Sequence, residues 1–172
     1  MSTNAPDAPK LNLPSDVRVA IVAARFNVEI VNALLEGCIN RLEAEGIRGT
    51  RLDVHRVPGA FELPVTAAAL ARTGRFGAVI CLGCVIRGDT PHFEYVAGEA
   101  ARGIQQVSIA ERLPIIFGVL TTNTEQQAWD RTGGSHGHAG ERAAEAALEM
   151  ISVLATIRAN ADRETLVDPT NG

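Results

Sequence analysis

The sequence of 172 residues contains a single lysine, Lys10, and this scarcity excludes two kinds of chemistry from most of the chain. Lys10 lies in a proline-bearing N-terminal arm, residues 1–16, that we expect to be flexible. A lysine that forms a Schiff base with a substrate, or one that binds phosphate in a Walker-type loop, is therefore absent from the expected domain at residues 17–158. No G-x-G-x-x-G run occurs either, so no local motif supports a dinucleotide fold.

Basic surfaces, long apolar runs and paired cysteines are scarce as well. The net charge of −4 argues against a nucleic-acid partner, because such proteins normally carry a basic face. No apolar run reaches the roughly 18 residues of a membrane span, so we expect no membrane partner. The N-terminus lacks the apolar core of a signal peptide, so we expect a cytoplasmic protein. The odd count of three cysteines, Cys38, Cys81 and Cys84, argues against a disulfide framework. Cys81 and Cys84 are three apart in one predicted strand and so point to opposite faces, which argues against a shared metal ion or disulfide.

Apolar runs alternate with stretches of helical spacing along the chain. Strands are expected at residues 17–24, 50–57, 78–85 and 114–120, and helices at 28–45, 61–73, 93–112, 124–132 and 141–158. Residues 133–140 read as a flexible loop, and residues 159–172 as a frayed tail. Strands joined by helices form right-handed crossovers and a parallel sheet covered on both faces. The sequence therefore predicts an α/β fold, a flavodoxin-like three-layer sandwich with a four-stranded parallel sheet.

The stretch from Leu82 to Val96 carries the first functional signal. An apolar strand ends here in a turn whose backbone N–H groups at Gly88, Asp89 and Thr90 form a natural anion cradle. His92 follows at the expected start of a helix, and histidine is the side chain that ordinarily transfers protons near neutral pH. The pattern predicts an anion site beside a proton-transfer group.

The carboxyl ends of parallel strands meet at one edge of the sheet, so this turn should lie near Phe26 and Glu62. Together these residues suit a small polar ring compound with a phosphorylated fragment. Each also has a simpler interpretation: His92 as a cap or surface residue, Phe26 as core and Glu62 as a helix cap. His136 and His138 hint at a metal site, but no cysteine or acidic cluster accompanies them, and we expect no metal.

Three motifs carry a resemblance to a known family. They are VPGAFELP at residues 57–64, GCVIRGDTPHFEYV at 83–96 and FGVLTT at 117–122. In order and spacing the chain resembles 6,7-dimethyl-8-ribityllumazine synthases, the penultimate enzymes of riboflavin synthesis, from Val17 to Leu154.

The resemblance implies a role for each matched position. Phe26 would stack on the pyrimidine ring, and His92 would transfer protons. The ribityl chain and pyrimidine would be bound by Ala60, Phe61, Glu62, Cys84, Val85 and Ile86. Asp89 and Thr90 would bind phosphate, and a neighbouring subunit would contribute Phe117 and Arg131.

The resemblance also implies the reaction and the assembly. Members of the family condense 5-amino-6-(D-ribitylamino)uracil with 3,4-dihydroxy-2-butanone 4-phosphate, and they release phosphate and water without a cofactor. They form homopentamers, and some close into icosahedral shells of 60 subunits. The spacing from Arg131 to Gly140 favours the shell, and an association with riboflavin synthase is a further expectation.

One position departs from the family pattern. Where the family usually has Asn-Lys-Gly, this chain has His138, Ala139 and Gly140, so a phosphate-binding lysine is missing. We expect weaker binding of the butanone phosphate, with His138 or Arg142 as the replacement cation. A rival hypothesis is a paralogue of low activity that binds a flavin or lumazine or forms a shell; Ala139 is the feature that favours it.

Overall fold

The computed structural model describes residues 10–167 and contains one four-stranded parallel sheet in the order β2-β1-β3-β4. The strands are β1 (Val19–Ala24), β2 (Leu52–Val57), β3 (Ala78–Ile86) and β4 (Ile115–Thr122). β1 and the first seven residues of β3 are buried, because they form the middle of the sheet and are covered on both faces. The predicted α/β fold with a four-stranded parallel sheet is confirmed.

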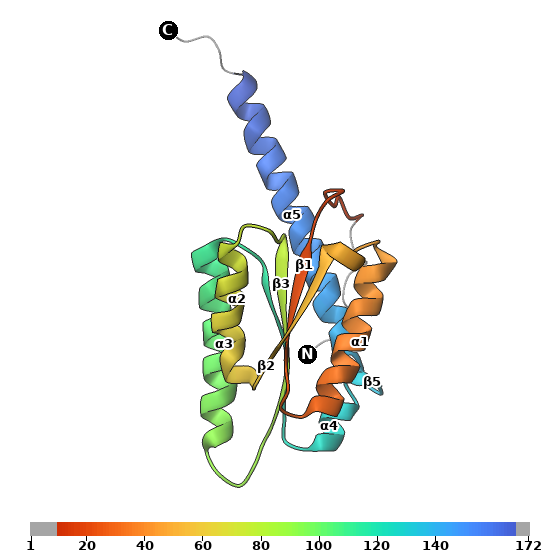
Figure 1. Ribbon diagram of the computed structural model, residues 1–172, viewed down its shortest axis with the longest axis vertical. Helices are drawn as coiled ribbons and strands as arrows, with labels where there is room; N and C mark the ends of the chain where they lie inside the picture. The colour runs from red at the N-terminus through yellow and green to blue at the C-terminus, as the bar shows by residue number, and fades with distance from the viewer. Residues whose placement is uncertain (1–9, 168–172) are drawn as a thin grey trace.

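Helices cover both faces of the sheet (Figure 1). One layer holds α2 (Leu63–Arg72) and α3 (His92–Glu111). The other holds α1 (Val28–Ala44), the short α4 (Glu125–Trp129) and α5 (Ala139–Val167). Short 3₁₀ turns at Gly49–Arg51 and Ala60–Glu62 precede β2 and α2. Pro64 lies in the first turn of α2, where its missing N–H costs no hydrogen bond.

The sheet separates two apolar cores. Residues such as Ile21, Leu34 and Leu148 fill the space between the sheet and the layer of α1 and α5. Val22, Leu63 and Ile104 belong to the core on the opposite face. Both cores are typical of a three-layer sandwich, in which each sheet face is buried against its own helices.

The cysteines of β3 belong to different cores, as the strand period predicted. Cys84 packs on the side of α1 and Cys81 on the side of α2 and α3. Burial raises the pKa of the Cys81 thiol to about 12. Burial, with a smaller contribution from the charge of Glu125, raises the pKa of Cys84 to about 11. Both thiols are therefore neutral packing groups near neutral pH, and neither is an activated nucleophile.

The prediction of a flexible loop at residues 133–140 was wrong. A small hairpin occupies this place, with β5 (Thr132–Gly134) paired to β6 (Gly137–His138), and α5 begins directly after it. The hairpin is held by tertiary contacts that no local pattern reveals. The His138 ring lies so close to Gly37 of α1 that a Cβ there would overlap it, and a Cβ on Gly140 would overlap the carbonyl oxygen of Leu34. Two glycines thus permit the close approach of the hairpin and α5 to α1.

The two ends of the chain also differ from expectation within the described residues. The final helix does not end at residue 158 but continues to Val167, and Figure 1 shows its last part projecting beyond the sheet. In the expected N-terminal arm, Leu11 and Leu13 pack against the core, and the Asn12 N–H donates to Ser152 Oγ at 2.8 Å. The remaining parts of both predicted tails, residues 1–9 and 168–172, lie outside the described residues.

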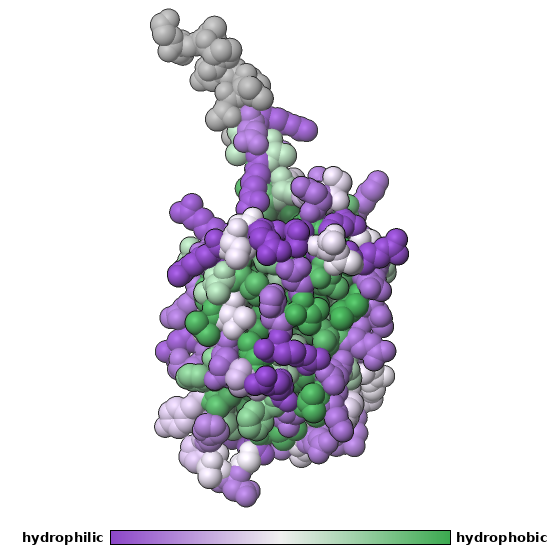
Figure 2. Space-filling view, viewed as in Figure 1, coloured by the Kyte–Doolittle hydropathy of each residue, from purple (hydrophilic) through white to green (hydrophobic). Residues whose placement is uncertain are grey.

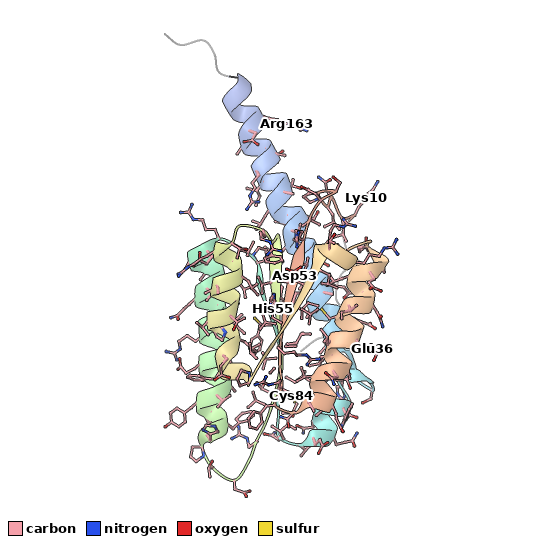
Figure 3. All side chains as sticks on the ribbon, viewed as in Figure 1. Lys10, Glu36, Asp53, His55, Cys84 and Arg163 are labelled. Atoms are coloured by element: carbon pink, nitrogen blue, oxygen red, sulfur yellow. The ribbon has the colours of Figure 1, made fainter. Side chains whose placement is uncertain are left out.

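The side of the molecule at the β2 edge of the sheet is less buried than the two sides that the helices cover. Figure 2 shows apolar side chains reaching the surface in the middle of this face, between polar side chains of the flanking helices. Val54 of β2 is 42% exposed, because β2 is an edge strand with a neighbour on one side only. Lys10 lies at the amino end of the sheet, far from Cys84 near the carboxyl end (Figure 3). The only lysine therefore lies far from the predicted site.

Candidate active site

The connections after β1, β2 and β3 meet at the carboxyl edge of the sheet, at the lower end of Figure 1. The loop after β1 is bound to that after β2, since the Arg25 N–H donates to Val57 O at 2.8 Å and the Phe26 N–H to Pro58 O at 3.1 Å. Asn27 then adopts a left-handed conformation with a φ of 55°, which asparagine tolerates better than most residues. Its Nδ2 donates to the Cys84 carbonyl oxygen at 2.9 Å, so one side chain fixes the ends of β1 and β3 together.

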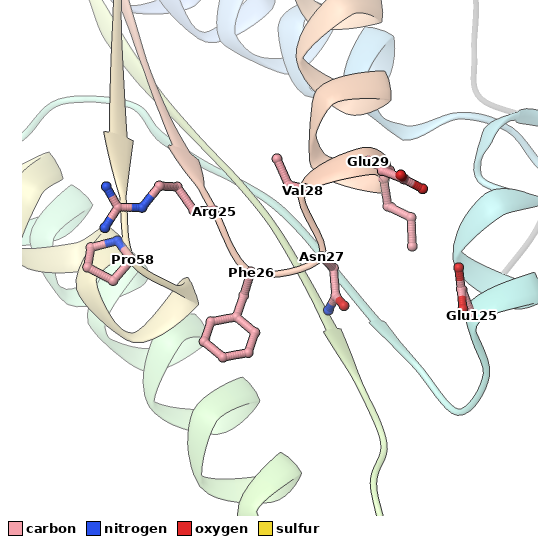
Figure 4. Close-up of a pocket in the computed structure, with 8 residues that line it drawn as sticks. Arg25, Phe26, Asn27, Val28, Glu29, Pro58 and Glu125 are labelled. Carbon is pink, nitrogen blue, oxygen red and sulfur yellow. The ribbon is translucent and has the colours of Figure 1, made fainter.

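Phe26 is not a core residue. Its side chain is 73% exposed, and Figure 4 shows the ring projecting from the loop near Pro58 and Arg25. The ring lies above Gly59, where an added Cβ would be 3.7 Å from Phe26 Cδ2. A large apolar ring exposed at a strand end is available to stack on a ligand, so the structure favours a platform over core packing.

Glu62 caps the turn that follows β2, as one of its two interpretations predicted. Its Oε2 accepts a hydrogen bond from the Gly59 N–H at 2.8 Å, and this bond closes the 3₁₀ turn at Ala60–Glu62. The contact also holds the carboxylate next to Gly59, on the side where the Phe26 ring lies. Ala60 is buried, whereas Phe61 is 57% exposed, so Ala60 offers a ligand little beyond its backbone.

A hollow of about 640 Å³ opens beside Phe26. Figure 4 shows side chains from the loop after β1, from the start of α1 and from Glu125 around it. The lining residues are Arg25, Phe26, Asn27, Val28, Glu29, Ile30, Pro58 and Glu125. Its size falls in the range of small-molecule sites. Of the residues predicted for the site, Phe26 alone lines this hollow.

The predicted anion cradle lies on the turn between β3 and α3. Asp89 and Thr90 are exposed, and His92 is the first residue of α3. The side chain of His92 makes no hydrogen bond or ion pair within residues 10–167, so it does not cap the helix and is free to meet a bound molecule. Val85 and Ile86 are half-buried just before this turn, with Cys84 beneath them.

Phe117 and Arg131 do not join this group within the chain. Phe117 is 44% exposed on β4, the opposite edge strand from β2, and neither residue lines the hollow at Phe26. One Arg131 terminal nitrogen donates to Gln127 O at 2.6 Å, and the Arg131 carbonyl accepts from the Ala139 N–H at 2.8 Å. Phe117 instead lines a smaller hollow of about 210 Å³ with Ala139 and Arg142.

The two candidates for the missing lysine have different surroundings. His138 packs against Gly37, and its Nδ1 is buried without a hydrogen-bond partner in the described chain. Arg142 is exposed, donates to the His136 carbonyl at 3.0 Å and lines the hollow with Phe117. Among the described residues, no cluster of three or more His, Cys, Asp or Glu is arranged to hold a metal ion.

Two residues at this edge were given no role by the sequence. Asn27 has a weak signal, since asparagine between a strand and a helix is a common left-handed residue. Arg87 contacts Asn123 after β4 and Glu94 at the start of α3; it has no such signal because Asn123 is 36 residues away and no local motif pairs Arg87 with Glu94.

No helix among residues 10–167 is both long and apolar enough to cross a membrane. The family model described as 6,7-dimethyl-8-ribityllumazine synthase matches residues 16–155. A relative from Protochlamydia amoebophila (strain UWE25), named 6,7-dimethyl-8-ribityllumazine synthase, is 49% identical over 144 residues, which cover 84% of this chain and 83% of the relative. The resemblance found in the three motifs is thereby confirmed, and the chain belongs to the 6,7-dimethyl-8-ribityllumazine synthase family.

Proposed function

We propose that this protein is a transferase of riboflavin biosynthesis that condenses 5-amino-6-(D-ribitylamino)uracil with 3,4-dihydroxy-2-butanone 4-phosphate. The products are 6,7-dimethyl-8-ribityllumazine, phosphate and water. The observation that carries this proposal is the exposed Phe26 ring beside a hollow of about 640 Å³, with family membership supporting the reaction. Nothing in the chain favours the rival paralogue beyond the alanine at position 139.

The pyrimidine and the phosphate of the two substrates would bind to different parts of the edge. We assign the pyrimidine ring to Phe26 and to the end of β3 at Cys84, Val85 and Ile86, where the buried Cys84 would contribute its backbone rather than its thiol. The segment of Ala60, Phe61 and Glu62 would bind the ribityl chain, with Glu62 already oriented by the Gly59 N–H. The backbone N–H groups of Asp89 and Thr90, and the hydroxyl of Thr90, would bind phosphate.

The reaction needs proton transfer and positioning more than a cofactor. An amine of the pyrimidine attacks the butanone carbonyl, so no enzymic lysine is required for the imine. Loss of one water on imine formation, elimination of phosphate, and ring closure with loss of a second water then require protons to move. We assign this transfer to the imidazole of His92, at the first residue of α3. Holding both substrates on one edge supplies further rate by removing the entropy cost of their encounter.

A neighbouring copy of the chain would complete the site. Neither Phe117 nor Arg131 lines the hollow at Phe26 within the chain; Phe117 is exposed on the edge strand β4, and Arg131 follows α4, where it donates to Gln127 O. We propose that they extend into the hollow of the next subunit of a homopentamer. The shell of 60 subunits, the association with riboflavin synthase and the cytoplasmic location stay predictions.

Turnover of both substrates by the purified protein tests the proposed function. We expect lumazine absorbance and fluorescence to appear together with free phosphate, and only when both substrates are present. Saturable binding of the lumazine without any turnover would contradict the proposed synthase activity and support the rival hypothesis of a lumazine-binding paralogue.

Substitution of Ala139 by lysine tests the consequence of the missing cation. Because Ala139 lines the same hollow as Phe117, we expect Ala139→Lys to lower KM for the butanone phosphate by about tenfold or more, as one added charge-assisted hydrogen bond allows. KM is measured by varying this substrate at saturating pyrimidine. Ala159→Lys, which adds the same charge at an exposed position of α5 outside this hollow, is the control, and an unchanged KM in Ala139→Lys rejects the idea.

A further inference from the structure

Arg87 follows β3 directly and reaches two other elements at the carboxyl edge. Its Nε donates to Asn123 Oδ1 at 2.9 Å, and one terminal nitrogen donates to Glu94 Oε1 at 2.7 Å. The guanidinium carbon also lies 4.3 Å from the centre of the Phe93 ring, a cation–π distance. One planar fork therefore joins the end of β3, the residue after β4 and the first turn of α3.

These three elements are the supports of the phosphate turn at residues 88–91. The Arg87 backbone N–H adds a bond to Thr122 O at 2.9 Å, which fixes the start of the turn. The side chains of Asp89 and Thr90 make no hydrogen bond within residues 10–167, so the turn is held from its two ends. The contacts of Arg87 are thus a principal restraint on where the turn's N–H groups and His92 lie.

The charge of Arg87 is already partnered. The Glu94 carboxylate lies against its terminal nitrogen, and the Asn123 amide oxygen accepts from Nε. The side chains of Arg87 and Glu94 are 43% and 61% exposed, and an exposed ion pair alone contributes little. The cluster fixes an orientation, because a planar guanidinium with two hydrogen-bond acceptors and a stacked aromatic ring permits only one arrangement of these groups.

We propose that Arg87 is a positioning residue that holds the turn at 88–91 and the start of α3 in the geometry that the reaction needs, and is not itself a phosphate ligand. This inference rests on the proposed function of the site. A positioning role requires the Arg87 guanidinium together with its two acceptors, Asn123 and Glu94. Removal of either acceptor should therefore have the same effect as removal of the guanidinium. A direct phosphate ligand would behave in the opposite way, because removal of Glu94 would free its charge for the substrate.

The test compares Arg87→Lys, Asn123→Ala and Glu94→Gln with the unmodified protein. Arg87→Lys keeps the charge and removes the fork, and the other two variants each remove one acceptor. We expect each to lower kcat by about tenfold, as a small misplacement of reacting groups does, and to leave KM for the pyrimidine unchanged. The backbone amides at positions 87 and 94 flank the turn and donate to Thr122 O and Pro91 O, so their hydrogen exchange, corrected for intrinsic rates, should become faster in all three variants. Arg102→Ala removes an exposed arginine near Glu99 on the same helix and should change neither quantity.

Two outcomes would overturn the proposal. In the first, Glu94→Gln and Asn123→Ala keep the native exchange rate and bind the butanone phosphate as well as or better than the unmodified protein, while Arg87→Lys binds it more weakly. In the second, Arg87→Lys keeps both native kcat and native exchange. Absence of turnover in the unmodified protein would reject the proposed function instead, and the exchange rates would still decide whether Arg87 holds the turn.

Discussion

His92→Ala is expected to lower kcat by about 10²- to 10⁴-fold, the usual contribution of a positioned proton-transfer group. The imidazole is at the first residue of α3 and has no partner within residues 10–167, so its removal should cost the fold little. Steady-state rates of lumazine formation with both substrates saturating give this kcat. The titration of the protein with 6,7-dimethyl-8-ribityllumazine should be unchanged, because the stacking platform at Phe26 stays intact.

His55→Ala is the matched control for this variant. His55 is also exposed, and it lies on the edge strand β2, away from the phosphate turn (Figure 3). Its loss should leave kcat as it is. Equal activity of His92→Ala and the unmodified protein would show that the substrates themselves or water supply the protons, and the assignment of His92 would be wrong.

Arg131→Ala is expected to raise KM for 3,4-dihydroxy-2-butanone 4-phosphate by about 10- to 100-fold, the value of a hydrogen bond to a charged group. KM for the pyrimidine should stay near its original value, since the pyrimidine is assigned to Phe26 and the end of β3, whereas Arg131 is assigned to the phosphate of the other substrate. The measurement varies each substrate in turn with the other one saturating.

Arg131→Lys and Arg158→Ala are the comparisons for this result. Lysine keeps the charge and should recover part of the affinity, although it lacks the planar fork that suits a phosphate. Arg158 is exposed late in α5, so its loss should change neither KM. An equal rise of both KM values in Arg131→Ala would indicate a general defect of the assembly rather than a lost phosphate contact.

The sheet could be predicted because its central strands are apolar throughout. A run such as Val19 to Ala24 is buried on both faces and fits only the middle of a parallel sheet. The hairpin of β5 and β6 could not be predicted from the sequence, because it pairs only a few residues and depends on contacts of His138 and Gly140 with α1. Such contacts lie far apart in the sequence and leave no periodic signal.

In the candidate site, too, some features could be predicted from the sequence and others needed the structure. Strand ends and a glycine-bearing turn were sufficient to place Phe26, Glu62 and His92 at one edge. The exposure of Phe26 and the capping contact of Glu62 needed the structure, since a sequence gives an aromatic or acidic residue no direction. The fork of Arg87 was also beyond prediction, because its acceptors come from Glu94 and from Asn123, 36 positions away in the chain.

We propose that His92 of one copy and Arg131 of the next serve one lumazine synthase site, and co-assembly of two variants tests this shared site. His92→Ala and Arg131→Ala would be unfolded, combined in equal amounts and refolded together, and then assayed at a low butanone phosphate concentration at which each alone is nearly inactive. Random assembly in a ring of head-to-tail contacts restores about a quarter of the sites, so we predict lumazine formation at about a quarter of the unmodified rate. If the mixture is as inactive as its two parents while the unmodified protein recovers after the same treatment, His92 and Arg131 of neighbouring copies do not share a site.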